Sequence, residues 1–93
     1  MADKYKELRD CQDTGKVFLD LLDDYWDHHY GKMIVKGKRV LTVELHTGGW
    51  SENEEIMGIV EGHMFNFFWW QKSTRGGHYY YKVNTFGKWR WDR

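Results

Sequence analysis

The chain of 93 residues contains no proline and a single cysteine, Cys11. One cysteine excludes a disulfide within the chain and a zinc site built from several cysteines, and it predicts a cytoplasmic setting. Without proline, the ends of helices and strands have to be set by glycine and by capping side chains. The sequence also lacks an export signal and the run of about 18 to 20 apolar residues that a membrane span needs. We therefore expect no membrane partner.

The formal net charge is zero, because 14 Lys and Arg residues balance 14 Asp and Glu residues. The balance conceals an asymmetry along the chain. Residues 1–31 carry four basic and eight acidic residues, and residues 32–93 carry ten basic and six acidic residues. This distribution argues against an indiscriminate nucleic-acid binder. It predicts a protein with one acidic and one basic surface, unless the two parts of the chain pack against each other and cancel.

Aromatic residues are abundant, at 18% of the chain, with six Trp, six Tyr and five Phe. Such a chain can bury enough apolar area to offset the entropy of ordering, so it is not a disordered tail. The length predicts one domain over residues 1–93. Within it, residues 1–12 are either a flexible N-terminal segment or, over residues 3–11, one or two helical turns.

The segment from about residue 14 to residue 30 is typical of an amphipathic helix, with apolar residues at spacings of three and four. Asp13 or Thr14 would cap its start and Gly31 its end. Four aspartates at spacings of three and four form a continuous acidic stripe on the opposite side of this helix. The stripe is either a solvated helix face or a contact surface for a basic partner. Its members are Asp20, Asp23, Asp24 and Asp27.

Two strands are predicted next, over residues 33–35 and 39–47, joined by a hairpin turn at residues 36–38. A capping box of Ser51 and Glu54 predicts a helix over residues 51–62, against whose first turn Trp50 would pack. Aromatic strands are expected over residues 64–72 and 78–84, and residues 88–91 would suit a short edge strand. The expected fold class is therefore α+β, in the order α-β-β-α-β-β, with a mainly antiparallel sheet and two helices packed on one face.

A topological argument places two glycine-containing loops together. A strand–helix–strand unit should make strands 39–47 and 64–72 parallel, so the loops that follow them lie at the same end of the sheet. Glycine pairs, a helix N-terminus and an arginine would there form a binding surface, or an anion pocket. Glutamates in the first helical turn argue against a strongly anionic ligand. The candidate residues at this loop end are His46, Thr47, Gly48, Gly49, Trp50, Ser51, Arg75, Gly76, Gly77 and His78.

Two further functions are compatible with these residues. His46 and His78, with Arg75, would suit a metal-independent phosphodiesterase or a small protein that binds nucleotide or phosphate. Trp70, Tyr80 and Lys82 would form a sheet face that stacks single-stranded nucleic acid, contacts another protein or forms a homodimer. No P-loop, nucleophile elbow or HExxH motif is present. We therefore assign no catalytic residue, cofactor or metal, and favour a non-enzymatic protein.

The second half of the chain carries a family resemblance. Residues 49–56 (Gly-Trp-Ser-Glu-Asn-Glu-Glu-Ile), Trp70 and residues 75–79 (Arg-Gly-Gly-His-Tyr) resemble a pattern in short, mostly uncharacterised bacteriophage and prophage proteins. The resemblance covers residues 46–83. It implies a phage accessory protein in the host cytoplasm that binds a host protein or protein complex, plausibly as an inhibitor of host defence, and it transfers no site.

Overall fold

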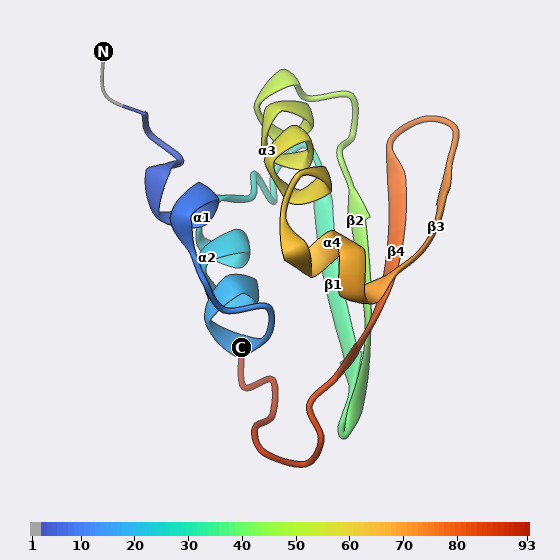
Figure 1. The fold of residues 1–93 in the computed structure, drawn as a ribbon. Coiled ribbons are helices and arrows are strands. Elements are labelled where there is room, and N and C mark those ends of the chain that lie inside the picture. Colours follow the sequence, from blue (N-terminus) through green and yellow to red (C-terminus); the bar gives the residue numbers. More distant parts are fainter. Residues whose placement is uncertain (1–2) are drawn as a thin grey trace.

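Residues 3–93, which the computed structural model describes, form a four-stranded antiparallel sheet that four helices cover on one face (Figure 1). The strand order is β1-β2-β4-β3. The predicted α+β class is confirmed, and so is the packing of helices on one face. The elements are α1 (Lys6–Asp10), α2 (Lys16–Tyr25), β1 (Lys32–Gly37), β2 (Val40–His46), α3 (Ser51–Glu61), α4 (Met64–Trp69), β3 (Trp70–Thr74) and β4 (His78–Asn84).

The two central strands, β2 and β4, carry the sheet side of the core. Leu41, Val43 and Leu45 alternate along β2 and are fully buried, as the sequence pattern predicts. Strand β4 is antiparallel to both β2 and β3. Strands β2 and β3 therefore run in the same direction, as predicted, but β4 lies between them.

The N-terminal helices pack against this sheet. Tyr5 and Leu8, within residues 1–12, are buried, so the described part of that segment belongs to the core. The N-cap residue of α2 is Gly15, so neither Asp13 nor Thr14 holds the expected N-cap position. The Asp13 carboxylate, two residues earlier, accepts from the Gly15 amide (3.0 Å) and the Val17 amide (2.9 Å).

Helix α2 ends at Tyr25, and the prediction that it continues to residue 30 is wrong. Trp26 has extended backbone angles (φ −64°, ψ 134°) and is buried in the core. Gly31 therefore does not end the helix. Burial of the Trp26 ring requires the chain to leave the helix several residues before the glycine stop signal.

Helix α3 also begins differently from the prediction. Its N-cap residue is Trp50, and no side chain forms a capping hydrogen bond, so the Ser51–Glu54 capping box is not formed. The Trp50 ring stacks on Tyr30 (4.4 Å between centroids, 22° between planes) instead of packing on the first turn of α3. The long-range aromatic contact takes precedence over the local capping motif.

The aromatic run after Gly62 is helical over Met64–Trp69, and the prediction of a strand there is wrong. His63 caps this helix, because its Nδ1 accepts from the Phe65 amide (3.0 Å) while its Nε2 donates to the Cys11 carbonyl (2.6 Å). The helix places Phe65 in the core, stacked on Phe18 (4.7 Å). Aromatic composition favours a strand, but capping and core packing determine the local structure here.

No strand follows β4 in the part of the chain that the structure describes, so the predicted edge strand at residues 88–91 is absent. The segment after β4 instead runs back toward the helices and ends near α2 (Figure 1). Trp89 and Trp91 pack partly buried against the core. None of the helices in residues 3–93 is long and apolar enough to cross a membrane.

We expect Tyr81 to make the free energy of unfolding depend on pH in the alkaline range. Its buried hydroxyl donates to Asn66 Oδ1 (2.9 Å) in α4. Burial raises the pKa of Tyr81 above the ordinary 10.0, since the core solvates the phenolate poorly. A raised folded-state pKa contributes stability that is complete below the unfolded pKa and is lost as the pH rises above it. We therefore expect the free energy of unfolding to fall above about pH 10.

The Tyr81→Phe variant tests this origin by urea unfolding between neutral and strongly alkaline pH. It should be less stable by about 1 kcal/mol at neutral pH, from the lost hydrogen bond, and should lose less stability in the alkaline range than the wild type. Tyr30→Phe, at an exposed tyrosine, is the control. An identical alkaline fall in wild type and Tyr81→Phe would contradict the assignment.

Candidate functional site

The two glycine loops do adjoin at one end of the sheet. The Thr47 amide donates to the Gly77 carbonyl (3.0 Å), which joins the loop after β2 to the turn before β4. Gly77 has a positive φ (83°), and a Cβ there would overlap the Thr47 hydroxyl. Glycine is required at this position both for its backbone angles and for the close approach.

Several backbone polar groups at this loop end form hydrogen bonds within the protein. The Gly49 amide donates to Thr47 Oγ1 (3.3 Å), and the Trp50 amide donates to the Thr47 carbonyl (3.1 Å). Arg75 lies in the exposed β3–β4 turn and forms no ion pair within residues 3–93. The structure therefore brings the predicted loop residues together, but the Gly49 and Trp50 amides already have acceptors within the loop.

His46 and His78 are in direct contact. Their Nδ1 atoms lie 2.7 Å apart, and His46 Nε2 lies 3.1 Å from Glu44 Oε1. With both rings neutral, the consistent assignment has His46 Nε2 donating to Glu44, and His78 Nδ1 donating to His46 Nδ1. The His78 Nε2 lone pair then remains available, close to Gly76.

This contact bears on the predicted phosphodiesterase chemistry. In-line cleavage needs an acid and a base on opposite sides of the phosphate, at the attacking and leaving oxygens. Two rings that touch through their Nδ1 atoms leave no space between them for a phosphate. The histidines contact each other directly, and their geometry does not favour a two-histidine cleavage site.

The sheet face away from the helices is basic, and we call it the open face. Strand register places on it Lys32, Ile34, Lys36, Thr42, Glu44, His46, Lys72, Thr74, His78, Tyr80 and Lys82. Four of these residues are lysines and only one is acidic. A shallow hollow of about 450 Å³ lies over the middle of this face, between β2, β4 and β3. The Lys72 ammonium lies 5.0 Å from the centre of the Tyr80 ring.

The predicted aromatic platform on this face is not formed. Trp70 pairs in register with Tyr81, whose side chain is buried on the helix side, so Trp70 and Tyr80 belong to opposite faces. Phe67 and Phe68 are exposed, but they lie on α4. Tyr80 and Lys82 do share the open face, where Tyr80 is the one Phe, Trp or Tyr of the sheet among residues 3–93.

The acidic stripe is largely occupied by the C-terminal residue of the chain. The Arg93 guanidinium lies 2.7 Å from Asp24, 3.3 Å from Asp23 and 3.9 Å from Asp20. Asp27 lies beyond the end of α2, where its carboxylate accepts from the His29 and Tyr30 amides, so it is not part of the stripe. The basic tail thus packs against the acidic front at this place, as one of the two sequence interpretations expects.

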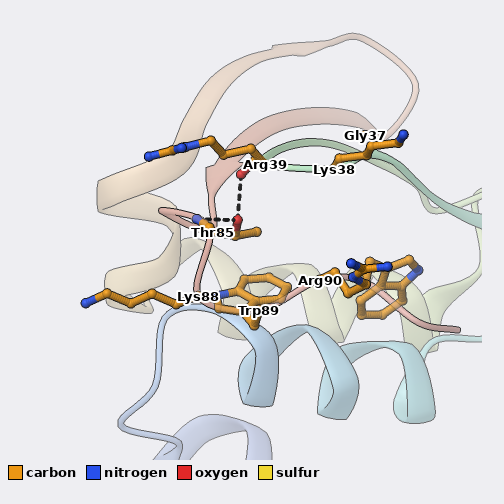
Figure 2. A pocket seen from close by; sticks show the side chains of 9 residues that line it. Gly37, Lys38, Arg39, Thr85, Lys88, Trp89 and Arg90 are labelled. Atoms are coloured by element: carbon orange, nitrogen blue, oxygen red, sulfur yellow. Dashed lines mark hydrogen bonds between the residues drawn. The ribbon is translucent and has the colours of Figure 1, made fainter.

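Sequence reasoning missed a pocket of about 670 Å³ at the end of the sheet opposite the glycine loops. The turn between β1 and β2 forms one wall and the segment after β4 forms the other (Figure 2). Two short runs of basic residues, 36–39 and 88–91, were the available signal. Only the fold shows that they face each other. The lining residues are Gly37, Lys38, Arg39, Thr85, Gly87, Lys88, Trp89, Arg90 and Trp91.

The described residues contain no group of three or more His, Cys, Asp and Glu side chains placed to hold a metal ion. Comparison with protein-family models, with curated proteins and with solved structures gave no match. Two places on the molecule gather accessible cations, the open face and the pocket between residues 37–39 and 85–91, which we call the basic pocket.

Proposed function

We propose that this protein acts without catalysis, by binding the acidic surface of a partner protein through its open face. Together with the resemblance of residues 46–83 to short bacteriophage proteins, this supports a role as a phage-type accessory protein that inhibits a host defence system. The partner would be a host protein or protein complex in the host cytoplasm.

The observation that carries this proposal is the distribution of unpaired cations. On the helix side, and at the chain end that reaches it, basic side chains are neutralised by carboxylates. These are Lys4, Lys6, Arg9, Lys16 and Arg93. The four lysines of the open face form no ion pair within residues 3–93. Unpaired charge of one sign on one face steers and orients a partner of the opposite sign.

A protein partner suits the open face better than nucleic acid does. Single-stranded nucleic acid is bound on sheets by several exposed aromatic rings on which successive bases stack. This face offers Tyr80 and the imidazoles of His46 and His78, and the His46 ring already contacts the other two edge to face. Ile34, Tyr80 and the Glu44 carboxylate add apolar and acceptor groups among the lysines. Such a mixture is typical of a protein interface.

Charge reversal on the open face tests the proposal. The variant Lys72→Glu/Lys82→Glu reverses two charges on the open face. The control, Lys4→Glu/Lys6→Glu, reverses two charges on the helix side and so changes the net charge by the same amount. Each tagged protein is incubated with lysates of several bacterial hosts, and retained proteins are identified by mass spectrometry. We expect the wild type and the helix-side variant to retain one partner that the open-face variant loses.

The identified partner is then purified and titrated at increasing salt, where its affinity should fall because the contact is electrostatic. Retention by both variants alike, or no partner in any host, would count against the proposal. The open face could instead bind a second copy of the chain, and gel filtration of the protein alone tests this. A homodimer that the open-face variant disrupts would contradict the proposal of a different partner protein.

A further inference from the structure

The basic pocket lies apart from the face to which the proposed function belongs. It is at the hairpin end of the sheet, where β1 ends, β2 begins and β4 ends. Thr85 fixes its two walls relative to each other, since both its amide and its hydroxyl donate to the Arg39 carbonyl (2.8 Å each). Figure 2 shows the bond from the Thr85 hydroxyl to the Arg39 carbonyl, with Arg39 on the hairpin wall and Lys88 and Trp89 on the facing wall.

Its charge is entirely of one sign. Four of the nine lining residues are cations, namely Lys38, Arg39, Lys88 and Arg90, and no carboxylate lines the pocket. None of the four forms an ion pair within residues 3–93. The Arg39 and Lys88 side chains extend to the same side of the pocket in Figure 2. Cations gathered from both walls without a counter-charge favour a ligand that carries several negative charges.

The pocket also contains two tryptophans. Trp89 and Trp91 are partly buried against the core, which holds their rings in place while leaving part of each toward the cavity. Trp89 lies beside α2, in contact with Gly15. Fixed indole rings stack well on planar aromatic groups, because little side-chain entropy is lost on binding.

A strained turn maintains this wall. Phe86 has a positive φ of 55° and is followed by Gly87 at 71°. Phe86 is the one non-glycine residue in the described chain with a positive φ. A left-handed conformation is strained in a bulky residue, because its Cβ approaches the backbone too closely. The turn brings Gly87 close to the Arg39 guanidinium, with 3.9 Å between Arg39 Cζ and a Cβ placed on Gly87.

From these observations we infer that the pocket is a nucleotide site. The cations of the two walls bind the phosphate groups, and the indole rings stack on the base. The volume of about 670 Å³ lies within the range of about 300 to 1,000 Å³ that small-molecule sites occupy. The same chemistry, phosphate joined to a planar base, is offered by a free nucleotide and by a single-stranded nucleic acid.

Isothermal titration of the full chain tests the site with four probes: ATP, adenosine, inorganic triphosphate and a short single-stranded oligothymidylate. ATP should bind at least tenfold more tightly than adenosine, which lacks phosphate, and more tightly than triphosphate, which lacks a base. Arg39→Ala and Lys88→Ala should each weaken binding about tenfold, the effect of one charge-assisted hydrogen bond. Arg75→Ala, an exposed arginine at the opposite end of the sheet, should have no effect.

The probes also separate the two sources. Binding of ATP that Arg39→Ala weakens supports a free nucleotide, and binding of oligothymidylate alone, weakened by the same variant, supports a nucleic-acid strand. Triphosphate binding as tight as that of ATP, binding unchanged in both pocket variants, or no binding of any probe would overturn the proposal. Thermal unfolding confirms that the variants are folded. The open-face variant Lys72→Glu/Lys82→Glu should still bind ATP, so this site and the proposed function can fail independently.

Discussion

Gly48→Ala should destabilise the protein by about 3 to 5 kcal/mol, a large part of the total stability of a small domain. Gly48 has a φ of 64°, and a Cβ there would overlap the Tyr30 carbonyl oxygen. The obstacle is backbone, so no side-chain rotation relieves it. The loop after β2 would have to move away from the chain that precedes β1.

Its neighbour provides a matched control. Gly49 has a similar φ of 73°, but a Cβ there meets nothing within 4 Å. Gly49→Ala should therefore cost only the strain of a left-handed residue, about 1 kcal/mol. Urea unfolding followed by circular dichroism measures both variants. Equal losses would show that backbone angles alone require these glycines and would contradict the close approach at Gly48.

Asn53→Ala should cost about 3 kcal/mol, because it removes three hydrogen bonds of a fully buried side chain and leaves the Asp27 amide without its acceptor. The Asn53 side chain is fully buried at the start of α3. Its Oδ1 accepts from the Asp27 amide (2.8 Å), and its Nδ2 donates to the carbonyls of Asp27 (3.0 Å) and Thr47 (3.3 Å). One side chain thus joins α3, the loop after β2 and the turn after α2.

The prediction is checked by urea unfolding of Asn53→Ala beside Glu55→Ala, which removes an exposed side chain of the same helix. The control should lie within about 0.5 kcal/mol of the wild type. Asn53→Asp keeps the acceptor and removes both donors, so it should also be destabilised. If Asn53→Asp were as stable as the wild type, the two carbonyl contacts would have no energetic role.

Patterns that depend on near neighbours in the sequence predicted much of the sheet. The alternation of residues 41–45 predicted the buried face of β2, and β4 has the predicted bounds. The prediction was wrong where a distant contact competes with local preference. Burial of Trp26 ends α2 early, stacking on Tyr30 determines the position of Trp50, and bonds from His63 make the following aromatic run helical.

The candidate sites show the same division. The topological argument placed the two glycine loops at one end of the sheet together with His46 and His78, because strand direction decides which loops share an end. The direct contact between the two histidines was not predicted. The basic pocket was missed, since Arg39 and Lys88 are far apart in sequence. Their approach depends on the turn at Phe86, and a positive φ in a phenylalanine has no sequence signal.

The strand order has a consequence for synthesis on the ribosome. The last strand of the sheet to be made, β4, occupies a central position between β2 and β3. Strands β1 and β2 are adjacent in the sequence and pair with each other, so this hairpin can form early. Strand β3 pairs with β4 and has no neighbour until β4 has been made. Completion of the sheet is therefore delayed until β4 has left the exit tunnel, and the nascent chain exposes aromatic residues until then.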